Sequence, residues 1–266
     1  MPALYNENDP KVAAWLRELI AQGHLPSGDV DERSIIDLDH AHIPGTAHFF
    51  AGIGGWPYAL ALAGWPSARP VWTGSCPCQP FSCAGSRLGA DDPRHLWPEW
   101  FRLIRECRPT AIFGEQVASA AGRRWLAGVR CDLESLGYAG GAAELCAASV
   151  GTPHIRQRLF WVADIERGRF TGPPAWRSAP HEERNVAAPQ QAGQPVGLAL
   201  VSGVQSPWPP GPSTVGSIPR MDDGVSALMV RGFGNAIVPH VAAEFVMAFM
   251  ETAGITGQEK GPTDGN

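Results

Sequence analysis

The chain has 266 residues, of which 44% are hydrophobic, so it suits one large domain and is too apolar for general disorder. Its net charge of −5 excludes a protein that holds nucleic acid by overall positive charge alone. The charge is unevenly spread: residues 1–55 carry −5, residues 56–231 carry +3, and residues 232–266 carry −3. The middle of the chain therefore tolerates a polyanionic partner.

No apolar run approaches the roughly 20 residues of a membrane-spanning helix, and the N-terminus becomes polar within a few residues. We therefore expect a cytoplasmic protein with no signal peptide and no membrane attachment. The six cysteines, at positions 76, 78, 83, 107, 131 and 146, are irregularly spaced, so a disulfide framework is not expected.

In chain order, the first predicted element is an amphipathic helix over residues 9–22, with Asp9 and Pro10 as a good helix start. Residues 46–51 read as a buried strand that enters a glycine-rich turn, and a helix follows at 56–64. Further strands are predicted at 71–74, 110–114, 141–148 and 158–163, and further helices at 97–107, 120–136 and 240–251. This alternation predicts an α/β fold with a mainly parallel sheet.

Residues 166–220 differ from the rest because they hold 10 Pro and 7 Gly and show no hydrophobic period. We predict a small irregular lobe at 164–225 beside a main domain formed by residues 1–163 and 226–251. The polar residues 252–266 are predicted to form a disordered tail.

Residues 74–85 (GSCPCQPFSCAG) follow a predicted strand directly, where an open α/β sheet presents its reactive loops. Three interpretations compete for Cys76, Cys78 and Cys83. They could bind a metal, although no second cysteine or histidine pair at a zinc-site spacing accompanies them, and we expect no metal. They could be buried small residues, or one of them could be a nucleophile.

The segment 77–82 (PCQPFS) resembles the nucleophile motif of the DNA (cytosine-5) methyltransferases. The resemblance implies that Cys78 is the catalytic nucleophile. It also implies that Pro77 borders the cofactor and that Gln79 and Ser82 contact the substrate.

Other motifs of the same family appear in positions that make chemical sense. Residues 50–55 (FAGIGG) resemble its cofactor loop, which implies that Phe50 lies against the adenine of S-adenosylmethionine and that Gly52 and Gly54 line the site. Residues 115–117 (EQV) resemble the family's E-N-V, with Gln116 in place of Asn. The acidic residue that performs chemistry, Glu115, is retained.

Two further segments complete the set. Residues 151–158 (GTPHIRQR) resemble G-V-P-Q-x-R-x-R, with Arg156 and Arg158 matching and His154 replacing Gln. Residues 234–239 (GNAIVP) resemble the closing G-N-A-V-x-P, which implies that Asn235 returns to the cofactor pocket.

The order of the motifs departs from the family. In the usual order, two strand–helix units that carry the ribose- and adenine-binding carboxylates lie between the cofactor loop and the nucleophile, but here 26 residues separate Gly52 from Cys78. Residues 6–9 (NEND) and 28–30 (GDV) resemble the missing motifs. The resemblance implies a circular permutation in which Glu7 and Asp29 bind the cofactor, with residues 31–45 as a crossover.

The resemblance implies a Rossmann-like, S-adenosylmethionine-dependent enzyme of bacterial or phage type, related to restriction-modification, that methylates cytosine C5 in double-stranded DNA as a monomer. Cys78 would add to C6 of a flipped-out base, Glu115 would hold the N3 edge, Arg158 would contact O2, and Arg156 would order the loop. Phosphate or guanine contacts in the lobe would come from arginines, which are Arg167, Arg169, Arg177 and Arg184. RNA cytosine methylation and an inactive DNA-binding relative are the alternatives.

Overall fold

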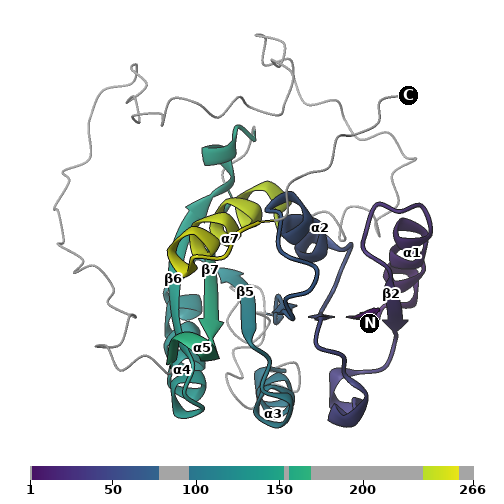
Figure 1. Cartoon of the computed structure of the whole chain (residues 1–266), viewed down its shortest axis with the longest axis horizontal. Helices are drawn as coiled ribbons and strands as arrows, with labels where there is room; N and C mark the ends of the chain where they lie inside the picture. The colour runs from purple at the N-terminus through teal and green to yellow at the C-terminus, as the bar shows by residue number, and fades with distance from the viewer. Residues whose placement is uncertain (1, 78–95, 153–155, 169–235, 258–266) are drawn as a thin grey trace, which may run out of the picture.

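A computed structural model of the chain describes residues 2–77, 96–152, 156–168 and 236–257, and Figure 1 shows their arrangement. The described part is a seven-stranded sheet with helices on both faces. Its strands are β1 (Ala3–Asn6), β2 (Gly28–Asp31), β3 (Ala47–Phe49), β4 (Trp72–Gly74), β5 (Ala111–Val117), β6 (Ala139–Cys146) and β7 (Gln157–Asp164). They lie in the order β2-β1-β3-β4-β5-β7-β6, with the first five parallel and β7 antiparallel to both of its neighbours.

The longer helices are α1 (Pro10–Ala21), α2 (Gly55–Leu62), α3 (Trp97–Cys107), α4 (Ala120–Ser135) and α7 (Pro239–Ala253). A short helix, α5 (Ile165–Gly168), follows β7, and 3-10 turns occur at η1 (Ile35–Asp37), η2 (His40–His42) and η5 (Ala147–Val150). Helix α1 begins where the sequence indicates, because the Asp9 side chain accepts hydrogen bonds from the backbone amides of Lys11 and Val12.

Side chains that are neighbours across the sheet alternate between its two faces, as strand geometry requires. One row faces helices α1, α2 and α7 and consists of Tyr5, His48, Thr73, Phe113 and Val162. The next row faces η1, α3 and α4 and consists of Leu4, Ala47, Trp72, Ile112 and Ala163. Both faces of the sheet are therefore buried, which accounts for the apolar character of the strands.

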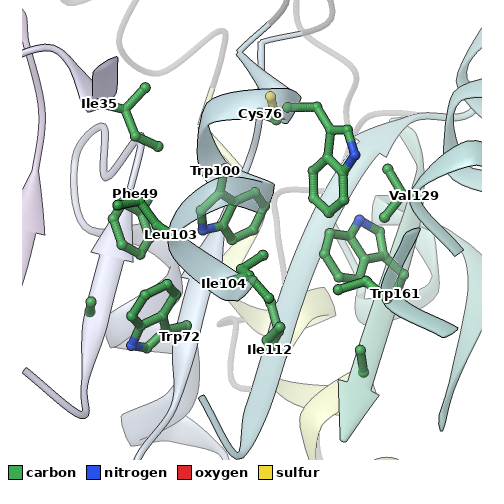
Figure 2. Close-up of a cluster of buried hydrophobic side chains, with 14 of the residues drawn as sticks. Ile35, Phe49, Trp72, Cys76, Trp100, Leu103, Ile104, Ile112, Val129 and Trp161 are labelled. Carbon is green, nitrogen blue, oxygen red and sulfur yellow. The ribbon is translucent and has the colours of Figure 1, made fainter. Parts of the chain in front are cut away.

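Aromatic rings fill much of the face covered by α3 and α4 (Figure 2). Trp100 lies between Phe49 and Trp161, with ring centroids 5.9 and 5.8 Å away. Added Cβ atoms on Gly74 and Gly114 would come within 2.7 and 2.2 Å of the Trp100 and Trp161 rings. The tryptophans therefore pack directly on the backbone of β4 and β5, where these strands approach their carboxyl ends.

The unit β3–α2–β4 has the opposite hand to the other parallel crossovers. The connections β1–α1–β2 and β3–α2–β4 place their helices on the same face but step in opposite directions across the sheet. The β2–β3 connection and α3 lie on the other face and step toward β5, so they share the hand of β1–α1–β2. Since such crossovers are right-handed in nearly all proteins, we assign β3–α2–β4 as the left-handed exception.

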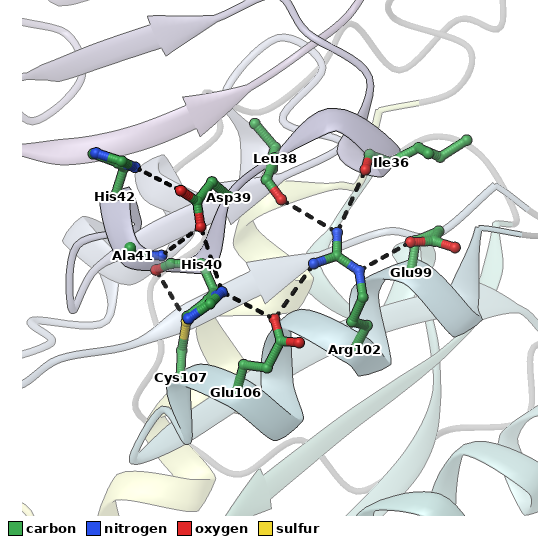
Figure 3. A network of polar contacts seen from close by, with 10 residues as sticks. All are labelled: Ile36, Leu38, Asp39, His40, Ala41, His42, Glu99, Arg102, Glu106 and Cys107. Atoms are coloured by element: carbon green, nitrogen blue, oxygen red, sulfur yellow. Dashed lines mark hydrogen bonds and ion pairs between the residues drawn. The ribbon is translucent and has the colours of Figure 1, made fainter.

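The long connection from β2 to β3 is fastened to α3 by a polar network (Figure 3). The Arg102 guanidinium donates to the carbonyl oxygen of Leu38 at 3.2 Å and pairs with Glu99 at 3.1 Å and Glu106 at 3.3 Å. Glu106 also lies 3.4 Å from the His40 imidazole. Because these groups are partly exposed to solvent, the network fixes the path of the crossover more than it adds stability.

Most expected elements are found, with three differences in extent. Strand β5 continues through residues 115–117, which were expected to follow it, because seven consecutive residues pair with β7. Asp164 ends β7 and pairs with the sheet, so it does not start an irregular lobe, and α7 runs two residues past 251. Residues 226–235 of the predicted main domain lie outside the described residues. None of the described helices is long and apolar enough to cross a bilayer.

A histidine is buried on the central strand β3. The His48 side chain is 2% exposed, bonds the Thr73 hydroxyl at 2.8 Å and packs on Tyr5 with ring centroids 5.0 Å apart. Burial lowers its pKa to about 3. The folded protein thus carries a neutral imidazole over a pH range in which the unfolded chain binds a proton.

We predict that acid destabilises the fold through His48. As pH falls from 6.5 toward 3, the unfolded state alone gains this proton, so the free energy of unfolding drops by about 1.4 kcal/mol per pH unit from this group. The variant His48→Gln keeps a partner for Thr73 and should lose this dependence. Urea unfolding at pH 7, 6 and 5 measures it, and an equally steep loss in the variant would contradict the assignment.

Candidate active site

Polar groups gather at the carboxyl ends of the parallel strands, the edge at which open α/β sheets bind ligands. Strands β1, β3 and β4 end in register at Asn6, Phe49 and Gly74, and β5 continues the row with Gly114. The loops that follow these strand ends, together with the last residues of β5, contain most of the described residues singled out from the sequence.

The glycine-rich loop after β3 is joined to the end of β1. The Glu7 Oε2 atom accepts a hydrogen bond from the Gly52 amide at 2.8 Å, and its Oε1 atom accepts one from the Asp9 amide at 3.0 Å. Gly52 and Gly54 have φ angles of 54° and 81°, which other residues rarely adopt. A Cβ atom on Gly54 would also lie 2.4 Å from Leu25, so this turn requires glycine for two reasons.

Phe50 shares the left-handed conformation, with φ of 50°, which is uncommon for a residue with a side chain. Its half-buried ring meets the Trp100 ring edge-on at 6.1 Å. The aromatic core thus reaches the loop and holds Phe50 at the rim of the sheet. Space remains open beside the loop, because an added Cβ on Gly52 would meet nothing closer than 4.0 Å.

Asn6 belongs to the motif at residues 6–9, but the sequence interpretation gave it no role. Its buried side-chain amide donates to the carbonyl oxygens of Asp31 at 3.2 Å and Arg33 at 2.8 Å, and its backbone carbonyl accepts from the Ala51 amide. One residue therefore ties together the ends of β1 and β2 and the glycine loop. Its position at the end of an apolar segment, directly before Glu7, was the sequence signal that could have marked it.

Asp29 and Asp31 occupy different places on β2. Asp29 is exposed and in register with Leu4, two positions before the end of the strand. Asp31 ends the strand in register with Asn6 and pairs with the Arg33 guanidinium at 2.6 Å, which holds the pKa of its carboxyl below the usual range. Of the two, Asp31 lies nearer to the carboxyl edge.

Glu115 on β5 is a buried carboxylate with polar and charged partners. It is 7% exposed, and its Oε1 atom lies 2.7 Å from the Arg158 Nε atom on the adjacent strand β7. Burial raises the pKa of the Glu115 carboxyl, whereas the charges of Arg158 and Arg156 and a hydrogen bond from the Ser75 hydroxyl oppose the rise. Burial thus favours the neutral form of Glu115, whereas its polar partners favour the charged form.

The backbone of β4 leads past Glu115 toward the predicted nucleophile. Ser75 follows Gly74, which pairs with Gly114, so Ser75 lies beside Glu115. The buried Gln116 amide donates to the Cys76 carbonyl oxygen at 3.5 Å, which joins this segment to β5. Half-buried Pro77 is the last described residue before Cys78.

Arg156 and Arg158 have different partners. The Arg156 guanidinium donates to the Ala236 carbonyl oxygen at 2.8 Å and so connects the start of β7 with the segment before α7. Arg158 faces Glu115 and also donates to the Gln157 carbonyl oxygen. These two arginines thus lie at one strand end but act on different parts of the site.

Several residues singled out from the sequence lie outside the described part of the chain. They are Cys78, Gln79, Ser82, Cys83, His154, Arg169, Arg177, Arg184 and Asn235. Arg167 lies in α5, at the far end of β7 from Arg158.

The alternative roles of the cysteine loop are tested at one position. Cys76 is 4% exposed and packs in the aromatic core with Trp97 and Trp100, as expected of a buried small residue. Within the described ranges, no three His, Cys, Asp or Glu side chains are arranged to hold a metal ion.

Comparisons with known proteins find sequence relatives for this part of the chain. Residues 68–196 match the family model of the C-5 cytosine-specific DNA methylases. The chain is 39% identical over 93 residues to the type II methyltransferase M.NgoMIV of Neisseria gonorrhoeae, which covers 34% of this chain and 30% of that protein. It is 37% identical over 162 residues to M.NaeI of Lentzea aerocolonigenes, covering 59% of this chain and 33% of that one.

The matched region thus spans about a third of the length of these curated relatives. Among solved structures, a DNMT2 variant from Spodoptera frugiperda matches with a TM-score of 0.40 and 16% identity over 67% of this chain and 54% of that chain. Residues 68–196, which include β4 through β7, are thus similar in sequence to the C-5 cytosine-specific DNA methylases, and the relatives matched here are type II methyltransferases.

Proposed function

We propose that the protein transfers a methyl group from S-adenosylmethionine to C5 of cytosine in double-stranded DNA. The observation that carries the proposal is the buried Glu115, held by Arg158 and lying beside the segment that leads to Cys78. A buried carboxyl group with a raised pKa can give a proton to a ring nitrogen and take it back.

Cytosine C5 is a weak nucleophile until a group adds to C6. In the proposed mechanism the Cys78 thiolate forms a bond to C6, and Glu115 donates a proton to N3, so that the ring becomes an enamine. Arg158 orients Glu115 and, once the base is in place, faces its O2 side. After methylation a base removes the C5 proton, and the bond between Cys78 and C6 breaks to restore the aromatic ring.

The residues at the ends of β1 and β3 fit S-adenosylmethionine, which supplies the electrophilic methyl group when it is bound. The Glu7 carboxylate uses two of its acceptor positions on the Gly52 and Asp9 amides, and its remaining lone pairs can accept from ribose hydroxyls. Phe50 offers a ring beside the open space at Gly52. Asp31 adds a second carboxylate at the same edge.

The sheet supports a revised view of the motif order. Strand β1, which Glu7 follows, and strand β2, which carries Asp29 and Asp31, lie on the same side of β3, where they would supply the carboxylates expected from the family. A circular permutation, however, would carry the cofactor-loop unit to the far end of the chain, whereas here it lies between β2 and β4. We therefore propose an exchange of two neighbouring blocks, residues 2–31 and 46–65, in place of a circular permutation.

The target base has to leave the duplex to reach Glu115, at a cost of a few kcal/mol. We assign recognition of the surrounding sequence to the segment after β7, residues 165–225, with Arg169 as the first candidate for a contact with DNA. Arg167, in α5, lies at the end of β7 away from Glu115 and is the weaker candidate. The proposed enzyme acts as a monomer on DNA, as a modification methyltransferase.

We predict that Cys78→Ala abolishes tritium transfer from labelled S-adenosylmethionine to cytosine-containing duplex DNA, because the proposed C6 adduct needs the Cys78 thiolate. The exposed cysteine of α4 provides the matched control, and Cys131→Ala should transfer label at the wild-type rate. Transfer by Cys78→Ala at the wild-type rate would refute the mechanism. A preference for transfer RNA over DNA would refute the proposed substrate.

We also predict that Glu7→Ala weakens S-adenosylmethionine binding more than tenfold, since a hydrogen bond to a charged group contributes about 1.5–3 kcal/mol. Glu7→Gln retains an acceptor for the Gly52 amide and should still bind weakly, which separates loss of the charge from loss of the loop contact. Isothermal titration calorimetry measures the effect, with Glu18→Ala on the exposed face of α1 as control. Unchanged affinity in both Glu7 variants would remove the ribose assignment.

A further inference from the structure

A hydrogen-bond chain runs from the first turn of α2 to Glu115. The Trp56 indole Nε1 atom donates to the Ser75 Oγ atom at 3.1 Å, and the Ser75 hydroxyl bonds the Glu115 carboxylate. Glu115 in turn receives the Arg158 guanidinium at 2.7 Å. The carboxylate is therefore held from β4 on one side and from β7 on the other.

The direction of this chain is fixed by the chemistry of its members. An indole N–H can only donate, and a carboxylate can only accept. A serine hydroxyl has one proton, so while it accepts from Trp56 it can direct that proton to Glu115. While Glu115 is ionised, neither it nor Trp56 can exchange roles, and the hydroxyl proton is directed to the carboxylate.

Trp56 is itself held rigidly. The side chain is 5% exposed, and its ring contacts Phe113 and Phe160 at centroid distances of 6.1 and 6.0 Å. It is the second residue of α2, directly after the glycine loop that ends at Gly54. A movement of the loop and the start of α2 would therefore displace the donor of Ser75.

We propose that Ser75 is a positioning residue for Glu115 and that Trp56 sets its direction, so that the glycine loop and the proton-handling carboxylate are coupled through one hydrogen-bonded unit. The catalytic meaning of this coupling rests on the proposed function, whereas the coupling itself does not. Its consequence is that the loop, when it is in place, aligns Glu115 for the base, and loop disorder releases it.

The coupling is tested first by a measurement that does not depend on methyl transfer. Protein labelled with ¹³C at glutamate carboxyls is titrated by NMR, and the Glu115 signal is assigned by its loss in Glu115→Gln. Ser75→Ala removes a donor to the charged form, so the midpoint of Glu115 should move to higher pH. Ser75→Thr keeps the hydroxyl and should titrate like the wild type, as should Ser135→Ala, an exposed serine of α4.

Trp56→Phe should move the midpoint in the same direction by a smaller amount, because Ser75 loses its orientation but not its hydroxyl. The double variant of Trp56→Phe and Ser75→Ala should move it no further than Ser75→Ala alone. A Glu115 midpoint unchanged in Ser75→Ala, or additive shifts in the double variant, would overturn the coupling.

Methyl transfer is measured in parallel. Ser75→Ala should lower kcat about tenfold with the KM for DNA and for S-adenosylmethionine changed less than twofold, and Ser75→Thr should recover most of the rate. An equal rise in both KM values with kcat unchanged would overturn the positioning role. If the Glu115 midpoint moves in Ser75→Ala as expected but the wild-type protein transfers no methyl group, the coupling is supported and the proposed function is overturned.

Discussion

A carboxylate that is taken out of water needs charged or hydrogen-bonding partners inside the protein, and this requirement organises the proposed active edge. Glu115 receives Arg158 from β7 and Ser75 from the end of β4, so both strands that flank β5 contribute a partner. The antiparallel placement of β7 is part of this solution, because it brings Arg158 at its start to the carboxyl end of β5. Without β7 the carboxylate would lose its ion pair with Arg158, and without β4 it would lose the Ser75 hydroxyl.

The same edge explains why a rearranged chain order is tolerated. The ends of β1 and β3 meet through Glu7 and Gly52 and through Asn6 and Ala51, contacts that do not depend on which strand comes first in the chain. The left-handed β3–α2–β4 unit follows from the proposed exchange. Helix α2 covers the same face of the sheet as α1, but the chain that leaves α2 continues to β4. In the usual order of the family motifs it would continue to the strand that is β1 here.

Much of this architecture could be predicted from sequence, because hydrophobic patterns and the residues that begin or end helices and strands are local features. Asp9 and Pro10 mark the start of α1, and the apolar runs around positions 47, 72 and 112 mark strands with both faces covered. The extension of β5 through Glu115 could not be predicted, since it depends on pairing with β7. The roles of Asn6, Ser75 and Trp56 likewise depend on contacts between residues that lie 19 to 40 positions apart in the chain. Each of the three nevertheless lies in or beside a recognisable motif.

The central claim is that Cys78 forms a covalent bond to cytosine at this edge. It is tested most directly by incubating the protein and S-adenosylmethionine with duplex DNA in which 5-fluorocytosine replaces the target base, and by mass spectrometry of the product. Fluorine at C5 cannot leave as a proton does, so the account predicts a stable one-to-one adduct on the peptide that contains Cys78. Complete absence of the adduct from protein that binds both ligands, or an adduct on another residue, would contradict it.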